Sequence, residues 1–217
     1  MPFDKEAIAK TVKKVKESAG KRKFKQSIDL AINLRDIDPS KPESKINLEV
    51  TLPKPVPKAV KICALVYGDT AVRAKEGGVN RVVEREEIEA LGTDKKKAKK
   101  LASEFDFFIA RADLMPLIGK NLGPVLGPRG KMPTAVNPTA NLAPVIERLK
   151  RVVKVKVGRQ TIALMRVGTE TMKDEDIVEN VQAVVEALTA KLERGDKNIR
   201  SMYLKTTMGP SIKIGAS

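Results

Sequence analysis

The sequence predicts a protein of mixed α/β and α+β class, with a split α+β domain built from both termini and a doubly wound α/β domain inserted into it. Two observations support this class. The terminal segments contain strands in which apolar and polar residues alternate, which is typical of half-buried antiparallel sheets. The middle contains short, almost wholly apolar strands separated by helical segments, which is typical of a parallel sheet covered on both faces. We expect the domains at residues 1–57 plus 155–217 and at residues 58–154.

The first terminal segment begins with a helix and continues with two strands. Apolar residues at helical spacing among Lys and Glu predict a helix over residues 4–19. Strict alternation predicts half-buried strands over residues 27–35 and 46–52. Residues 38–43 between them are rich in Pro, Ser and Asp, and this composition indicates a turn.

The middle segment is set off by residues 53–57, where three prolines in five residues suit neither a helix nor a central strand. Nearly continuous apolar runs predict strands at residues 60–67, 79–83 and 105–110. Helical patterns fall at residues 94–104, 113–119 and about 139–150. A Gly- and Pro-rich stretch separates the last two helices. This order of elements is the basis for the inserted α/β domain.

Alternating character returns in the last segment. Val and Lys alternate up to residue 157, and Gly158-Arg159 predicts a hairpin turn into a return strand over residues 161–167. The clearest amphipathic helix of the chain spans residues 174–193. A last strand is expected over residues 200–207, with residues 211–214 as its extension. The two chain crossings between the domains would permit a hinge.

The charge of the chain indicates a polyanionic partner. Lys and Arg total 42 against 27 acidic residues, for a net charge of +15. Such an excess costs self-repulsion and favours binding to nucleic acid. Residues 58–154 hold 19 basic and 11 acidic residues, a net charge of +8, and the terminal segments hold 23 and 16, a net charge of +7. The net charge therefore supports nucleic-acid binding but does not indicate which of the two domains binds.

Composition excludes several classes of site. The chain has no His, so the usual Ser-His-Asp and Cys-His catalytic groups are impossible within it. A single Cys, Cys63, permits neither an intramolecular disulfide nor a Cys/His zinc site, and its apolar neighbours favour a buried thiol. No stretch approaches the ~18 apolar residues of a membrane span. We expect a soluble cytoplasmic protein without a cofactor, a metal or a membrane partner.

Two segments of the middle domain suggest phosphate binding. Lys95 to Lys100 is the densest basic run, and it is either a phosphate-contacting face or, more commonly for such runs, a solvated helix face. The loop at residues 123–133 contains Gly130-Lys131, as in a phosphate-binding loop. The match fails in detail because Val125 stands where the pattern needs Gly and Met132 where it needs Ser or Thr. These mismatches favour a structural or RNA-contacting loop over a nucleotide site.

Two further segments of the terminal domain suit RNA. Residues 206–211 combine hydroxyls, a thioether, Gly and Pro, a set able to contact ribose and phosphate edges, although a simple corner between strands would look the same. Phe24 stands among Lys and Arg residues just before the first strand. Its ring could stack on a base or a ribose. The alternative is a core Phe that anchors the entry to the strand.

Taken together, the motifs resemble the universal L-one family of ribosomal proteins of the lateral stalk. The matching segments are Phe105–Ala110, Leu114–Pro116, Leu126–Pro133 and Thr206–Pro210, in this order along essentially the whole chain. The most specific part is Gly-Pro-Arg-Gly-Lys-Met-Pro followed at a distance by Thr-Met-Gly-Pro. The length, and Lys131 where bacterial members usually carry Leu, resemble archaeal members.

The resemblance implies a non-enzymatic constituent of the large ribosomal subunit. Its terminal α+β domain would bind the ribosomal RNA of the stalk, and the inserted domain would be Rossmann-like and three-layered, without a nucleotide. The implied roles include helping to release deacylated tRNA from the exit site and repressing translation of the protein's own messenger RNA. The resemblance also implies a cytoplasmic, ribosome-bound protein that is a monomer when free.

The resemblance also implies the residues that contact RNA. They are Lys23, Phe24, Ser27, Val167, Gly168, Thr169, Ser201, Thr207, Met208, Gly209 and Pro210. Thr169 stands where the family often has Lys. Compact RNA folds are read largely through backbone shape and 2′-hydroxyls, a task for which hydroxyl, glycine and thioether groups are suited. The lysines add salt-dependent attraction.

Two other functions compete with a stalk protein. One is a nucleotide-dependent enzyme that uses the inserted domain, which the fold alone would permit. The absence of His, the failed phosphate-loop pattern and the lack of an acidic metal cluster argue against it. The other is a nonspecific coating protein for DNA or RNA. The chain has few aromatic residues and two structured domains, so a protein that recognises the shape of a folded RNA is the better hypothesis.

Overall fold

The chain forms two compact units in a computed structural model that describes residues 4–20, 22–37, 46–57, 60–138, 142–157 and 160–215. One unit consists of Met1–Pro57 and Arg151–Ser217, and the other of Lys58–Lys150. The mixed α/β class is confirmed. The chain returns to the first unit after Lys150 rather than after residue 154, because β7 (Val152–Lys156) pairs along its whole length with β2 (Asn47–Thr51).

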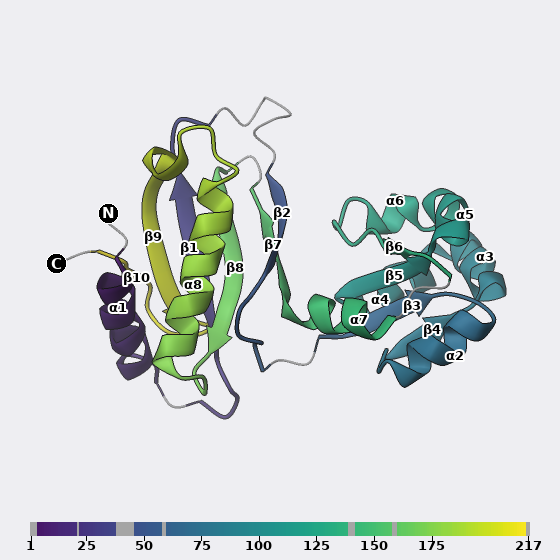
Figure 1. Cartoon of the computed structure of the whole chain (residues 1–217), viewed down its shortest axis with the longest axis horizontal. Coiled ribbons are helices and arrows are strands. Elements are labelled where there is room, and N and C mark those ends of the chain that lie inside the picture. The colour runs from purple at the N-terminus through teal and green to yellow at the C-terminus, as the bar shows by residue number, and fades with distance from the viewer. Residues whose placement is uncertain are drawn as a thin grey trace. The chain divides into compact units, whose positions relative to one another are not determined.

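The first unit contains a four-stranded antiparallel sheet in the order β10-β9-β1-β8. Its strands are β1 (Ser27–Leu34), β8 (Ile162–Thr169), β9 (Ile199–Thr206) and β10 (Ile212–Lys213). Two helices cover one face, α1 (Lys5–Glu17) and α8 (Asp174–Thr189), and Figure 1 shows α8 lying in front of β1 and β8. A one-turn 3-10 helix, η3 (Gly195–Asn198), leads into β9.

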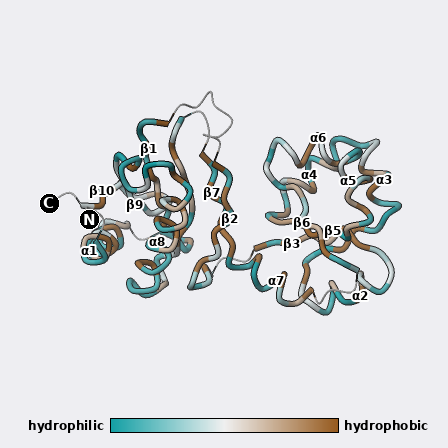
Figure 2. Tube along the Cα trace, turned by 45° about the horizontal axis from the view of Figure 1, so that its top comes forward, coloured by the Kyte–Doolittle hydropathy of each residue, from teal (hydrophilic) through white to brown (hydrophobic). Residues whose placement is uncertain are grey.

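Burial in the first unit follows the predicted alternation. Every second residue of β1, from Ile28 to Leu34, is buried, and the others are half-buried on the opposite face. The buried residues pack with the apolar faces of α1 and α8 and with the inner residues of β2 and β7. Figure 2 shows hydrophobic residues gathered on the strands of each unit. One face of the four-stranded sheet therefore belongs to the core, and the other is not covered by these helices.

The second unit contains a parallel sheet in the order β4-β3-β5-β6. Its strands are β3 (Ile62–Leu65), β4 (Arg81–Val83), β5 (Phe107–Arg111) and β6 (Thr134–Val136). Its helices are α2 (Asp69–Glu76), α3 (Arg85–Thr93), α4 (Lys95–Glu104), η2 (Ala112–Leu114), α5 (Met115–Asn121), α6 (Gly123–Leu126) and α7 (Leu142–Arg151). All four residues of β3 are buried, as expected of a strand covered on both faces.

The structure differs from the sequence prediction at three places. The helix expected over residues 174–193 ends at Thr189, and Leu192 is buried through irregular turns instead. Residues 212–213 form a separate strand that turns back to pair with β9, and they do not extend it. The Gly- and Pro-rich stretch includes the short helix α6 and the edge strand β6. The turns predicted at residues 38–43 and 158–159 lie outside the described residues.

Candidate nucleic-acid interface

The start of β1 and the ends of β8 and β9 lie side by side at one end of the strands in the first unit's sheet. Ser27, the first residue of β1, stands opposite Thr169, the last residue of β8. On the other side, Ile28 stands opposite Thr206, the last residue of β9. Antiparallel pairing thus brings the start of β1 beside the ends of two strands that lie more than a hundred residues further along the chain. We call the described residues 22–27, 167–170 and 206–210 the sheet edge.

Hydrogen bonds fix the corner that follows β9 to the start of β1. The Thr207 amide donates to the Ser27 carbonyl at 3.0 Å. In return, the Ser27 amide donates to the Thr207 hydroxyl oxygen at 3.1 Å. The hydroxyl of Thr207 therefore has a structural partner as well as an exposed position.

Gln26, which sequence reasoning missed, joins all three segments of the sheet edge. It is only 1% exposed. Its side-chain oxygen accepts a hydrogen bond from the Met208 amide at 3.2 Å, and its side-chain nitrogen donates to the Gly20 carbonyl at 3.0 Å. Its own carbonyl accepts from the Glu170 amide at 3.0 Å. The sequence offered one indication, a Gln directly before a strand of alternating pattern. A buried amide side chain needs several hydrogen-bond partners, so such a residue often joins neighbouring segments.

The corner at Gly209 has a steric requirement for glycine. A Cβ atom at Gly209 would lie 2.3 Å from the Thr206 hydroxyl oxygen, closer than any side chain tolerates. The amide of Gly209 also donates to the Thr206 carbonyl at 3.3 Å, which closes a tight turn. Gly209 does not have a positive φ, so close approach rather than a left-handed backbone selects glycine here. Among the described residues, the buried Thr206 hydroxyl has no hydrogen-bond partner.

Phe24 and Met208 present apolar surface at this edge. Phe24 is 50% exposed and Met208 is 61% exposed. The alternative interpretation of Phe24 as a core residue is therefore wrong. Lys23 is exposed beside Phe24 in the segment that leads into β1, and Pro210 is exposed two residues beyond Met208. The edge thus combines an aromatic ring, a thioether and a cation on backbone that is held by hydrogen bonds, the groups that stack on bases and contact phosphates.

Val167, Gly168 and Thr169 are the last three residues of β8 and lie beneath the surface of the sheet edge. All three are buried. Val167 offers its carbonyl to Asn180 of α8, and the Thr169 hydroxyl lies 3.1 Å from the Thr171 hydroxyl. A Cβ atom at Gly168 would lie 3.0 Å from Ile177, so this position holds the end of β8 close to α8.

Ser201 lies apart from the other expected contact residues. It stands opposite Asn33 near the start of β9, whereas the sheet edge is at the end of β9. Five residues of extended strand separate Ser201 from Thr206, a distance of about 17 Å. The Asn33 side-chain amide donates to the Ser201 hydroxyl at 2.9 Å, across the uncovered face of the sheet.

The uncovered face adds a charged row that sequence reasoning also missed. Asp29 stands opposite Arg166 on one side and Lys205 on the other. A bulge in the pairing next to Asp29 shifts Arg166 into this row. The Arg166 Nε atom is buried without a hydrogen-bond partner among the described residues. Two cations and one carboxylate thus lie close to the sheet edge.

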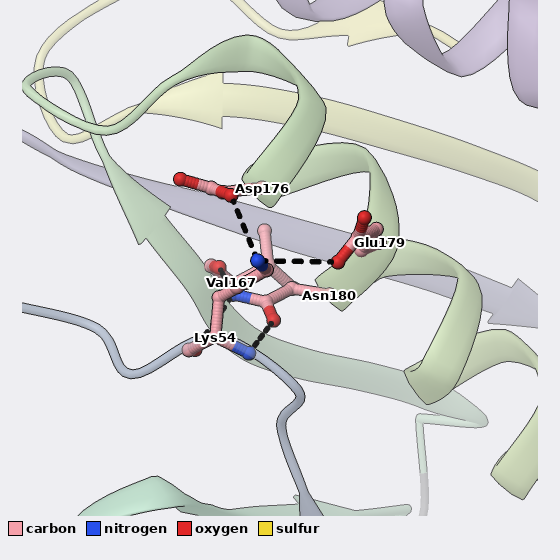
Figure 3. A network of polar contacts seen from close by, with 5 residues as sticks. All are labelled: Lys54, Val167, Asp176, Glu179 and Asn180. Carbon is pink, nitrogen blue, oxygen red and sulfur yellow. Dashed lines mark hydrogen bonds and ion pairs between the residues drawn. The ribbon is translucent and has the colours of Figure 1, made fainter.

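Asn180 of α8 binds the segment that leads out of the first unit at Lys54 and also binds β8 (Figure 3). It is fully buried on α8. Its side-chain nitrogen donates to the carbonyls of Val167 at 2.9 Å and Lys54 at 3.1 Å, and its oxygen accepts from the Lys54 amide at 3.0 Å. The Lys54 ammonium lies 3.5 Å from Asp176 and 3.9 Å from Glu179. These contacts hold Lys54 within the first unit.

The loop of the second unit that resembles a phosphate loop is a structural support for α4. The Lys131 ammonium donates to the carbonyls of Ala102 at 3.0 Å and Phe105 at 2.7 Å, where α4 ends and its carbonyls lack helical partners. Arg129 donates to the Ser103 hydroxyl of the same helix at 2.7 Å. Both cations of the loop are thus bound to the protein itself, which agrees with a structural loop.

No other chemistry competes for the site within the described part of the chain. Cys63 is fully buried, and desolvation by burial raises the pKa of its thiol to about 12, so it is not a nucleophile. The described residues contain no group of three or more His, Cys, Asp or Glu side chains that could hold a metal ion. No described helix is long and apolar enough to cross a membrane.

A unit built from both ends of the chain around an antiparallel sheet, with a parallel α/β unit inserted into it, defines a two-unit class of α/β protein. The family model of the ribosomal protein L1p/L10e family matches residues 12–210. The chain belongs to this family.

Curated archaeal proteins named large ribosomal subunit protein uL1 are similar over almost the full length. The protein of Methanothermobacter thermautotrophicus is 45% identical over 207 residues, covering 95% of this chain and 98% of the relative. The protein of Pyrococcus abyssi is 46% identical over 215 residues, covering 99% and 98%. The protein of Methanothermococcus thermolithotrophicus is 46% identical over 212 residues, covering 98% and 99%. The archaeal character predicted from the sequence is confirmed by these relatives.

Proposed function

We propose that the chain is a constituent of the large ribosomal subunit and that its sheet edge binds the ribosomal RNA of the stalk. One observation carries this proposal. Phe24 and Met208 are exposed apolar side chains on two segments that Gln26 and the Ser27–Thr207 hydrogen bonds hold together. Exposed apolar groups on a hydrogen-bonded, preorganised backbone are typical of a binding surface, because ordering them costs little at the moment of binding.

The residues at the edge divide into two roles under this proposal. Phe24, Met208 and Lys23 contact RNA by stacking, apolar contact and charge. Gly209, Gly168 and the buried Val167 and Thr169 hold the backbone in place. The row of Arg166, Asp29 and Lys205 extends the surface along the uncovered face, where its two cations add salt-dependent attraction to phosphates.

Substitution of the exposed side chains tests the sheet edge directly. Met208→Ala and Phe24→Ala should each weaken binding to a stalk RNA fragment about 10- to 100-fold, since a stacking or apolar anchor contributes about 1–3 kcal/mol. Val72→Ala is the matched control, because Val72 is 57% exposed on α2 of the other unit. Filter binding at moderate salt measures the effect. Affinities equal to that of the control would remove the sheet edge from the site.

Two finer roles belong to the same proposal. An L-one protein on the stalk would contact exit-site tRNA and assist its release, and it would bind a stalk-like fold in its own messenger RNA and repress translation. The names of the archaeal relatives support a protein of the large ribosomal subunit. Footprinting the protein on ribosomal RNA and on its own transcript tests the repressor role, which requires that the protein protect a similar fold in both RNAs.

We further propose that the protein is cytoplasmic and ribosome-bound, and a monomer when free. The names of the relatives support the ribosomal location. The net charge of +15 supports a monomer in the absence of RNA, since like charges oppose self-association. Sedimentation of the free protein and of cell-extract ribosomes measures both properties.

A further inference from the structure

The helix α4 presents an unusually dense cationic face in the second unit. Lys95, Lys96, Lys97, Lys99 and Lys100 are all exposed, and only Ala98, Leu101 and Ala102 of this ten-residue helix are buried. Of these five lysines, only Lys97 has an ion-pair partner among the described residues, Asp94 at 3.6 Å. The other four ammonium groups of the helix are available to an external partner.

This arrangement opposes the stability of the helix. Lys95, Lys96 and Lys97 occupy the first turn, where the partial positive charge of the helix N-terminus disfavours cations. Lys96 and Lys100 are four residues apart, as are Lys95 and Lys99, and like charges at that spacing repel. The carboxylate of Asp94 offsets part of the cost by accepting the amides of Lys96 at 3.0 Å and Lys97 at 3.2 Å. A sequence that is selected for helix stability alone would not place five lysines here.

Arg129 enlarges this face from a separate loop. Its Nη1 atom donates to the Ser103 hydroxyl at 2.7 Å and to the Lys99 carbonyl at 3.3 Å. The guanidinium therefore stays beside Lys99 and Ser103, while Lys131 fastens the loop to the end of the helix. Lys96 and Lys100 lie one helical turn apart, about 6 Å along the axis, on the side opposite the buried residues. We call Lys96, Lys99, Lys100 and Arg129 the α4 cationic face.

We infer that the α4 cationic face binds the sugar–phosphate backbone of double-helical RNA, as a second and sequence-independent contact. A row of ammonium groups and a guanidinium is complementary to closely spaced phosphates. The apolar residues of α4 are all buried in the core, so the helix has no apolar side chains to insert into a bilayer. This contact goes beyond the proposed function and does not involve the sheet edge of the first unit.

Salt dependence of RNA binding by the full chain tests the inference. The probe is an RNA hairpin of about 20 base pairs with a scrambled sequence. Each lost phosphate contact lowers the slope of log K against log salt by about 0.9, so Lys96→Gln with Lys100→Gln should lower it by about 2. Lys61→Gln with Lys75→Gln is the matched control, because it removes two exposed lysines from the same unit. The control therefore has the same net charge as the α4 variant. The control should keep the wild-type slope.

The outcomes separate this inference from the proposed function. The inference is supported if the slope of log K against log salt falls in the α4 variant and not in its control. The α4 variant should then lose the same fraction of its affinity for stalk RNA and for scrambled RNA. Equal slopes for the α4 variant and its control would overturn it, and so would phosphatidylserine vesicles that bind through these lysines while the RNA slope is unchanged. The α4 variant should unfold at or above the wild-type temperature, because the substitutions remove repulsion. Failure of the Met208→Ala test would leave these readings unaffected.

Discussion

Replacing Asn180 by Ala should destabilise the first unit strongly, because its side chain makes three hydrogen bonds in a fully buried position. These bonds join α8 to Val167 of β8 and to both backbone groups of Lys54. Each contributes about 0.5–1.5 kcal/mol net, and the unpaired carbonyls left behind add to the loss. The free energy of unfolding should fall by about 3 kcal/mol. With a urea m-value of about 2 kcal/mol/M, the midpoint falls by about 1.5 M.

Urea unfolding followed by circular dichroism measures this loss, with the two units analysed as separate transitions. Lys54→Ala is the control, because it removes two ion pairs with partly exposed partners and keeps the backbone bonds to Asn180. Exposed ion pairs contribute ~0–1 kcal/mol, so this control should change stability little. A loss below about 1 kcal/mol for Asn180→Ala, or an equal loss for Lys54→Ala, would refute the role of the buried amide.

Three other perturbations test separate parts of the structure. Gly209→Ala should weaken stalk RNA binding at least about tenfold by displacing the corner, and Thr206→Ala with Gly209→Ala should restore part of it, since the clashing hydroxyl is removed. Lys131→Met should lower the stability of the second unit by about 1–3 kcal/mol in urea unfolding, because two carbonyls at the end of α4 lose a charged donor. The Cys63 thiol, with its pKa raised to about 12, should stay protonated at pH 9 and react with iodoacetamide only after unfolding.

Each of these predictions has a result that would contradict it. Equal RNA affinities for Gly209→Ala and the wild type would mean that the corner is not part of the interface. An unchanged unfolding midpoint for Lys131→Met would show that solvent replaces the ammonium. Alkylation of Cys63 in the folded protein, followed by mass spectrometry, would show that the core around β3 opens.

Strand and helix periodicity predicted the fold well because burial follows the regular spacing of side chains along each element. Alternation in residues 27–35 correctly placed Ile28 to Leu34 in the core. The continuous apolar run around Cys63 likewise indicated a strand covered on both faces. The exact return to the first unit was missed, because β7 directly follows the helix α7 without an intervening loop.

The site was predicted less completely because its residues act through pairing that the sequence does not display. Gln26 reaches Gly20, Met208 and the Glu170 amide only after strands distant in sequence have paired. The bulge that moves Arg166 into the row with Asp29 is equally invisible in a linear pattern. Glycine at position 209 was noted, but its steric cause required the position of the Thr206 hydroxyl.

Binding of the wild-type chain to two RNAs of equal length tests the central claim most directly. One RNA is a fragment of the ribosomal stalk, and the other has the same composition in a scrambled order. A shape-reading sheet edge predicts affinity for the stalk RNA at least about 100-fold higher at moderate salt, as specific nucleic-acid recognition requires. Equal affinity for the two RNAs would contradict the account, because the net charge of +15 alone would then explain the binding.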